Sequence, residues 1–168
     1  LVETAPWPIT LVASERGRAV YEKECGKFDL IAARAAEVYS DSDLAAPIAS
    51  GSVPTVGMVV LPCTVNTLGK IANGIADTLI TRAAHCHLKE RRKLILCVRE
   101  TPWSLINIRN AGDVAAAGGI VMPMSPPFYM AAGRDPESVT MAELLKAYVD
   151  RVLSVMGHLP KENWGTVR

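Results

Sequence analysis

The chain has 168 residues, enough for one domain with a substantial hydrophobic core and too few for two ordinary domains. Its 18 basic and 17 acidic residues leave a formal net charge of +1, which excludes a global field that would recruit nucleic acid or an anionic membrane. No apolar run approaches the roughly 20 residues that span a bilayer, and the N-terminus lacks a secretory signal pattern. We therefore expect a soluble, cytoplasmic protein with no nucleic-acid or membrane partner.

The hydrophobic pattern predicts strands that alternate with helices. The predicted strands are 8–14, 56–63, 93–98 and 120–123, with a brief extended piece at 38–39. The predicted helices are 15–25, 28–36, 68–75, 78–92, 104–117 and 139–156. Ser14, Asp77 and Ser104 are the expected N-caps of three of them. This alternation predicts a single α/β domain with a doubly wound parallel sheet, followed by an irregular tail at 158–168.

Polar side chains follow the predicted strands, at the point where each strand ends. They are Ser14, the run Thr64–Thr67, the pair Arg99–Glu100, and Tyr129. In open α/β sheets ligands bind beyond the carboxyl ends of the strands, so we expect these groups to build one polar pocket. Ordinary roles stay open as alternatives to ligand binding. Ser14 and Thr64–Thr67 could serve simply as helix caps, and the Tyr129 ring could simply pack against the protein.

Two cations are predicted to share one face of the helix at 78–92. Arg82 and Lys89 lie seven residues apart, which brings them to the same side of a helix. For Arg91 and Arg92 we favour an exposed helix end that complements the helix dipole. The small residues of the loop at 46–52 allow backbone to approach a flat ligand, although a plain turn is equally compatible. Such side chains favour binding of a phosphorylated ligand over nucleophilic catalysis.

Cysteine and histidine offer weaker signals. The four cysteines form no CxxC pair and fall in apolar surroundings, which predicts reduced thiols that act as small buried hydrophobes; they are Cys25, Cys63, Cys86 and Cys97. The sequence His85-Cys86-His87 is a poor metal site on a helix, since residues two apart diverge by roughly 200° around the axis. We expect no metal.

Three segments resemble the UbiX-type flavin prenyltransferases, flavoproteins of bacteria and archaea. They are APIASGS (46–52), MVVLPCTVNTLGKIANGIADTLITRAAHCHLKERRKLILCVRETP (58–102) and PPFY (126–129). LKERR followed by a strand and RETP is the specific part, whereas APIASGS alone is also compatible with the related cysteine decarboxylase flavoproteins. The resemblance covers most of residues 8–164.

The resemblance implies a Rossmann-like, flavodoxin-like subunit with three αβα layers, in a homo-oligomer that is commonly a dodecamer, with FMN at a subunit interface. It implies transfer of a dimethylallyl group from dimethylallyl phosphate to reduced FMN, without metal, to supply a UbiD-type decarboxylase. The implied flavin contacts are Ser14, Thr64, Val65, Asn66, Thr67 and Arg99, with Arg82 as a further cofactor-side residue. The implied groups around the prenyl phosphate are Lys89, Glu100, Tyr129 and Arg151, with Glu24 as a further active-site residue. In the implied mechanism N5 of the reduced flavin takes the allyl carbon and ring closure onto C6 follows. Glu24, Glu100 and the departing phosphate are alternative acceptors of the proton that this ring closure releases.

The chain departs from the family pattern at its start. Family members open with a strand and a Gly-Ala-Ser-Gly type loop for the flavin phosphate, and nothing before Pro8 resembles it. We expect that the sequence lacks this first segment, the alternative being that the protein has lost the site. The loop at 130–138 also looks longer than usual.

Two other functions remain open. A cysteine-peptide decarboxylase would need a catalytic histidine early in the chain, and His85, His87 and His158 are badly placed for that role. The second is a non-catalytic FMN-binding or carrier subunit.

Overall fold

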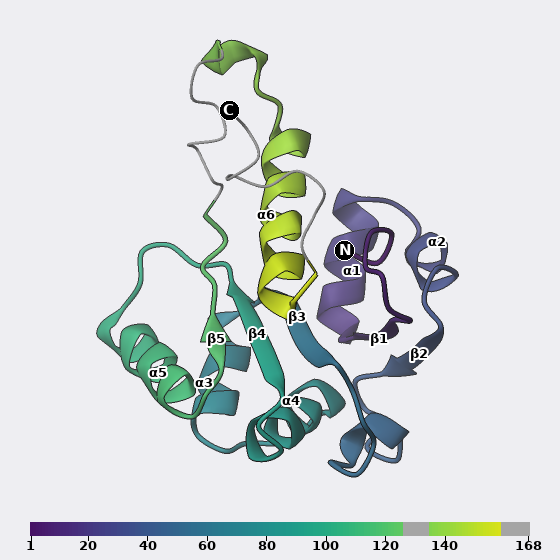
Figure 1. Ribbon diagram of the computed structural model, residues 1–168, viewed down its shortest axis with the longest axis vertical. Helices are drawn as coiled ribbons and strands as arrows, with labels where there is room; N and C mark the ends of the chain where they lie inside the picture. The colour runs from purple at the N-terminus through teal and green to yellow at the C-terminus, as the bar shows by residue number, and fades with distance from the viewer. Residues whose placement is uncertain (126–134, 159–168) are drawn as a thin grey trace.

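Parallel strands alternate with helices through residues 1–125 and 135–158, the part of the chain that the computed structural model describes (Figure 1). The strands are β1 (Thr10–Ala13), β2 (Glu37–Ser40), β3 (Gly57–Cys63), β4 (Lys93–Val98) and β5 (Ile120–Val121). The helices are α1 (Glu15–Glu24), α2 (Phe28–Ala32), α3 (Val65–Ala72), α4 (Leu79–Lys89), α5 (Leu105–Ala116) and α6 (Met141–Met156). The described residues also include the short 3-10 turns η1 (Pro47–Ala49) and η3 (Pro136–Ser138). The predicted α/β class with parallel strands is confirmed.

The strands form two hydrogen-bonded sheets where the sequence predicted one. β3, β4 and β5 pair in that order, and β1 pairs with β2 in a separate two-stranded sheet. Every pairing is parallel, as expected when helices connect successive strands. Figure 1 shows the β1–β2 pair to the side of β3, away from β5. No pairing joins β1 to β3 in the part of the fold described, so the sheet is divided there.

β4 is the centre of the core. Leu94, Leu96 and Val98 are almost fully buried in a cluster with residues of α3, α4 and α5. Ile95 and Cys97 alternate with them and pack on the opposite side, against α6. Successive side chains of a strand point to opposite faces, so β4 has helices on both sides. The predicted strand buried on two faces, between two helical layers, is confirmed.

Hydroxyl caps set where the helices of the site begin. Thr64 caps α3, which therefore starts at Val65, three residues earlier than predicted. The predicted cap of α4 at Asp77 is wrong, because Thr78 caps that helix in a capping box. Asp77 instead forms an ion pair with Lys70, with Nζ 2.7 Å from Oδ2. That hydrogen bond lowers the pKa of the Asp77 carboxyl.

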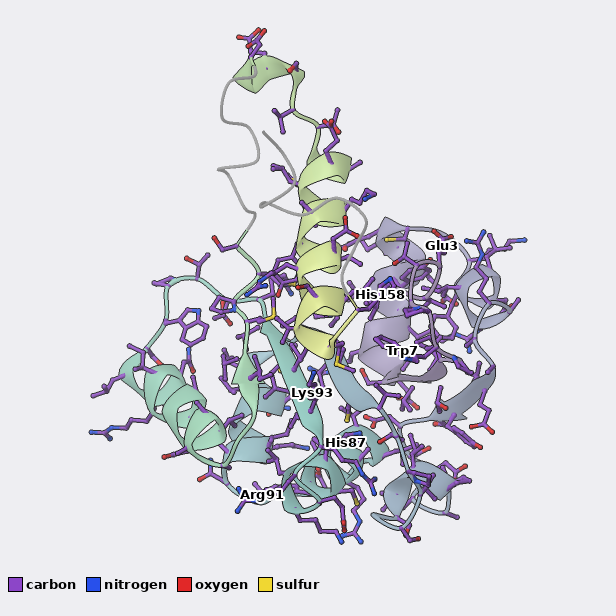
Figure 2. All side chains as sticks on the ribbon, viewed as in Figure 1. Glu3, Trp7, His87, Arg91, Lys93 and His158 are labelled. Atoms are coloured by element: carbon purple, nitrogen blue, oxygen red, sulfur yellow. The ribbon has the colours of Figure 1, made fainter. Side chains whose placement is uncertain are left out.

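The N-terminal residues pack near the end of α6. The rings of Trp7 and His158 meet edge to face, with their centroids 6.0 Å apart (Figure 2). Leu1 and Trp7 also pack against the cluster beneath α6. The tail at 159–168 and most of the loop at 130–138 lie outside the described residues.

The cysteines follow the prediction with one exception. All four are free thiols, and Cys63, Cys86 and Cys97 are buried. Cys25 is exposed at the end of α1, so its predicted burial is wrong. Within the described ranges, no helix combines the length and the apolar character needed to cross a membrane.

Candidate functional site

One group of predicted site residues gathers at the carboxyl ends of β3 and β4. Cys63 and Val98, the last residues of these strands, are partners in the parallel register. The backbone N–H of Arg99 donates to the carbonyl of Cys63 at 3.0 Å. Thr64 and Arg99 therefore leave the sheet side by side, and the Arg99 side chain is exposed.

The first turn of α3 adds hydroxyl and amide groups at this edge. Thr64 accepts a hydrogen bond from the Thr67 N–H at 3.2 Å, and the two hydroxyls lie 3.1 Å apart. Asn66 is exposed in the same turn and Val65 is half-buried. The first backbone N–H groups of a helix have no partner within the helix, so this turn can receive an anion or the polar edge of a ring.

Two further predicted residues lie at opposite ends of α1. Ser14 follows β1 and caps the helix by accepting from the Gly17 N–H at 3.1 Å. Glu24 is the last residue of α1 and is exposed. Ten residues of helix rise by about 15 Å, so α1 separates these two side chains.

The remaining predicted acidic and cationic residues are exposed. The Glu100 carboxylate accepts from the Thr101 N–H at 3.0 Å, and the Trp103 indole donates to the Glu100 carbonyl at 2.9 Å. Arg151 lies on α6 and is exposed. Tyr129 lies outside the described residues.

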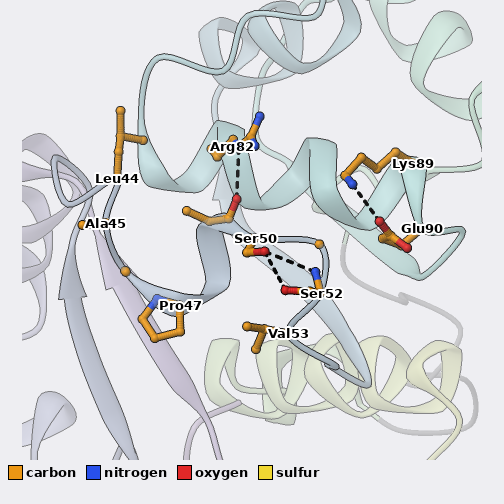
Figure 3. Close-up of a pocket in the computed structure, with 12 residues that line it drawn as sticks. Leu44, Ala45, Pro47, Ser50, Ser52, Val53, Arg82, Lys89 and Glu90 are labelled. Atoms are coloured by element: carbon orange, nitrogen blue, oxygen red, sulfur yellow. Dashed lines mark hydrogen bonds and ion pairs between the residues drawn. The ribbon is translucent and has the colours of Figure 1, made fainter.

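A second group surrounds an open pocket of about 660 Å³ beside α4 (Figure 3). The prediction that Arg82 and Lys89 share a helix face is confirmed, since both line this pocket. The Arg82 Nε donates to the carbonyl of Ala49 in η1 at 3.0 Å. The other lining residues come from the loop after β2 and the end of α4; they are Leu44, Ala45, Ala46, Pro47, Ser50, Gly51, Ser52, Val53 and Glu90.

Lys89 lies directly against the backbone of Gly51. A Cβ added at Gly51 would come within 2.7 Å of the Lys89 Nζ and 2.5 Å of the Glu90 Oε1. The ammonium of Lys89 forms an ion pair with Glu90 at 2.7 Å, and this hydrogen bond lowers the pKa of the Glu90 carboxyl. The hydroxyls of Ser50 and Ser52 lie 2.8 Å apart on the loop. Two cations beside paired hydroxyls are donors that suit a phosphate group.

Glu90 lines this pocket and was not predicted from the sequence. Its position next to Lys89 was the only available signal, because a glutamate at a helix end is usually a solvated surface residue. In the structure its carboxylate holds the ammonium that a phosphate would need.

The two groups of residues lie at opposite ends of β4. α4 leads into β4, so Lys89 lies near the start of that strand and Arg99 follows its end. The six residues of β4 span about 20 Å at the usual rise for a strand. Within one chain the structure therefore separates Lys89 from Arg99 and Glu100.

The buried thiol and imidazole near these groups do not form a nucleophilic centre. Burial raises the pKa of the Cys63 thiol to about 12, which keeps it protonated at neutral pH. Both ring nitrogens of His87 bind protein groups, Ala83 and Thr55, at 2.8 Å each. Among residues 1–125 and 135–158, no group of three His, Cys, Asp or Glu side chains could hold a metal ion.

Comparison with known proteins decides the family. The model of the Flavoprotein family matches residues 1–149. A flavin prenyltransferase UbiX from Thermoplasma acidophilum is 43% identical over 148 residues, which cover 88% of this chain and 79% of that protein. The chain belongs to the UbiX-type flavin prenyltransferases.

Solved structures agree with this membership. AnUbiX (PadA1), solved in complex with FMN and dimethylallyl pyrophosphate, matches with a TM-score of 0.83 and 36% identity over 92% of this chain and 81% of that one. A dodecameric FMN-dependent UbiX-like decarboxylase from Escherichia coli O157:H7 matches with a TM-score of 0.87 and 34% identity, over 98% of this chain and 87% of that one. The flavodoxin-like αβα fold implied by the resemblance is confirmed.

Proposed function

We propose that this chain transfers a dimethylallyl group from dimethylallyl phosphate to reduced FMN, and that a UbiD-type decarboxylase uses the prenylated product. The observation that carries the proposal is the pocket in which Arg82 and Lys89 lie beside the hydroxyls of Ser50 and Ser52. This donor set suits a small organic phosphate, and a relative of 36% identity binds FMN together with dimethylallyl pyrophosphate.

The groups at the carboxyl ends of β3 and β4 suit the flavin. Thr64, Thr67 and Asn66 offer hydroxyl and amide groups beside the first turn of α3, and Arg99 adds an exposed cation. These groups fit the polar edge of an isoalloxazine ring and an anion. Reduced FMN would supply the electron-rich ring that accepts the allyl carbon.

We propose that the complete site forms between copies of the chain. Lys89 and Arg99 lie at opposite ends of β4 in one subunit. One flavin and its prenyl phosphate could therefore contact both residues only where two subunits meet. The dodecameric state of a relative of 34% identity supports such an assembly.

The role of the cations follows from where charge develops. As the allylic C–O bond breaks, its electron pair stays with the phosphate, and Lys89 and Arg82 stabilise that negative charge electrostatically. Arg151 and Tyr129 are assigned to the same phosphate through the family resemblance. Glu24, Glu100 and the released phosphate remain alternatives for accepting the proton lost in ring closure.

The test is to incubate the purified protein with reduced FMN and dimethylallyl phosphate, without oxygen, and to measure the mass of the extracted flavin. A gain of one dimethylallyl unit, absent when the prenyl phosphate is omitted, supports prenyl transfer. Bound flavin of unchanged mass supports an FMN carrier, and release of carbon dioxide from a cysteine peptide supports a decarboxylase. Adding the product flavin to a UbiD-type apo-decarboxylase tests the proposed recipient.

A further inference from the structure

The pocket loop, defined here as residues 50–55, is held from its far side by two side chains. Arg92 is half-buried, and its Nη2 donates to the carbonyl of Gly51 at 2.7 Å while its Nη1 donates to that of Val53 at 2.7 Å. The two terminal nitrogens of one guanidinium thus bind two carbonyls that lie two residues apart. A lysine ammonium lacks this planar fork.

The end of α4 places Arg92 for this contact. Arg91 has a φ of 56°, in the left-handed region, and its N–H donates to Leu88. The Arg92 N–H donates to the carbonyl of His87 at 2.9 Å. These bonds form a Schellman motif, which ends the helix and turns the chain. Arg92 therefore leaves the helix direction at the residue before β4.

His87 holds the other end of the pocket loop. Its ring is buried, and Nδ1 lies 2.8 Å from the Ala83 carbonyl, which can only accept, so Nδ1 carries the hydrogen. Nε2 of the neutral ring then accepts from the Thr55 hydroxyl at 2.8 Å. Burial, with a smaller effect of the Arg92 charge, lowers the pKa of His87 and favours this neutral form.

The contacts of the pocket loop with Arg92 and His87, together called the clamp, decide which side of the loop faces the pocket. The Gly51 carbonyl accepts a hydrogen bond from Arg92. A Cβ on the same residue would instead point at the Lys89 side chain, which lines the pocket. The negative end of the Gly51 carbonyl is therefore engaged by a cation outside the pocket. Without that bond the carbonyl could rotate toward the space where an anion would bind.

We propose that Arg92 and His87 are positioning residues, which fix the pocket loop in its phosphate-binding conformation and so set the affinity for phosphate without contacting it. The identity of the organic phosphate rests on the proposed function. From the sequence we expect Arg91 and Arg92 to share one role as helix-end charges, whereas in the structure Arg92 donates to two carbonyls of the pocket loop.

The test compares Arg92→Lys with Arg91→Lys, the same change one residue earlier on an exposed side chain. Loss of one charge-assisted hydrogen bond predicts that Arg92→Lys raises the KM for dimethylallyl phosphate about tenfold, with kcat within about threefold of wild type. Arg91→Lys should keep the wild-type KM. Equal KM values in the two variants would overturn the role of Arg92.

Thr55→Val and Thr55→Ser test the His87 end with milder changes. Thr55→Val removes the hydroxyl and should raise KM several-fold, while Thr55→Ser keeps it and should match wild type. If Arg92→Lys does not fold, this pair still tests the proposal at the His87 end of the pocket loop. Identical KM values for Thr55→Val and Thr55→Ser would overturn the role of His87.

Calorimetric titration with inorganic phosphate and amide hydrogen exchange separate this inference from the proposed function. Arg92→Lys should weaken phosphate binding and speed exchange in residues 50–55, while β4 stays as protected as in wild type. These results would support the clamp even if the wild-type protein transferred no prenyl group. Wild-type phosphate affinity and loop exchange in Arg92→Lys would reject it.

Discussion

Replacement of Lys89 by alanine is the most informative single change. The Lys89 side chain is 58% exposed and its ion pair is with Glu90, so the change should leave folding nearly intact. A charge-assisted hydrogen bond contributes about 1.5–3 kcal/mol, which corresponds to roughly 10- to 150-fold in rate. The loss in rate should reach the upper part of this range, because the phosphate gains negative charge as it leaves. In the variant, the Glu90 carboxylate also stays beside that phosphate without the Lys89 ammonium.

The assay is kcat/KM for dimethylallyl phosphate with reduced FMN, together with FMN affinity and the melting temperature. We expect kcat/KM to fall by about 100-fold, near the upper end of that range, while FMN remains bound. The double variant Lys89→Ala/Glu90→Gln should recover part of the loss. A value for Lys89→Ala within threefold of wild type would refute the role of this ammonium.

Three other changes test separate parts of the account. Glu90→Gln frees Lys89 and should lower the KM for dimethylallyl phosphate by about two- to fivefold at low ionic strength, measured by steady-state kinetics; a higher KM would count against competition for the ammonium. Arg91→Gly relieves a left-handed non-glycine residue and should raise the free energy of unfolding by about 1 kcal/mol in urea titrations, and a loss of stability would contradict this. The pKa of His87 is lowered in the folded state, so its contribution to stability is present above pH 6.5, the ordinary histidine value, and is lost as pH falls below it. The urea midpoint should therefore fall less between pH 7.5 and pH 5.5 in His87→Gln than in wild type, and an equal fall would argue against this linkage.

The elements of the fold were predictable because their signals are local. The apolar run of β4 and the helical spacing of Arg82 and Lys89 depend on neighbours within a few residues, and both predictions hold. The cap of α4 was misjudged because Asp77 and Thr78 are adjacent and both suit that position. A partner outside the helix, Lys70, engages Asp77.

The tertiary features of the site were not predictable from the sequence. The Arg92 contacts join backbone carbonyls that lie 39 and 41 residues earlier, and a carbonyl leaves no mark in the residue pattern. The division of the sheet between β1 and β3 likewise depends on hydrogen bonds between distant strands. The expected missing first strand and flavin-phosphate loop stay a prediction, as do the roles of Tyr129 and Arg151.

In the proposed site, Lys89 of one subunit and Glu100 of another serve one reaction. The most direct test of this arrangement is to combine Lys89→Ala subunits with Glu100→Ala subunits, by co-expression, and to measure prenyl transfer to reduced FMN. Random pairing gives about one site in four with both groups intact, so the mixture should recover up to about a quarter of wild-type activity above that of either variant alone. Activity no higher than that of each variant alone would contradict a site shared between subunits.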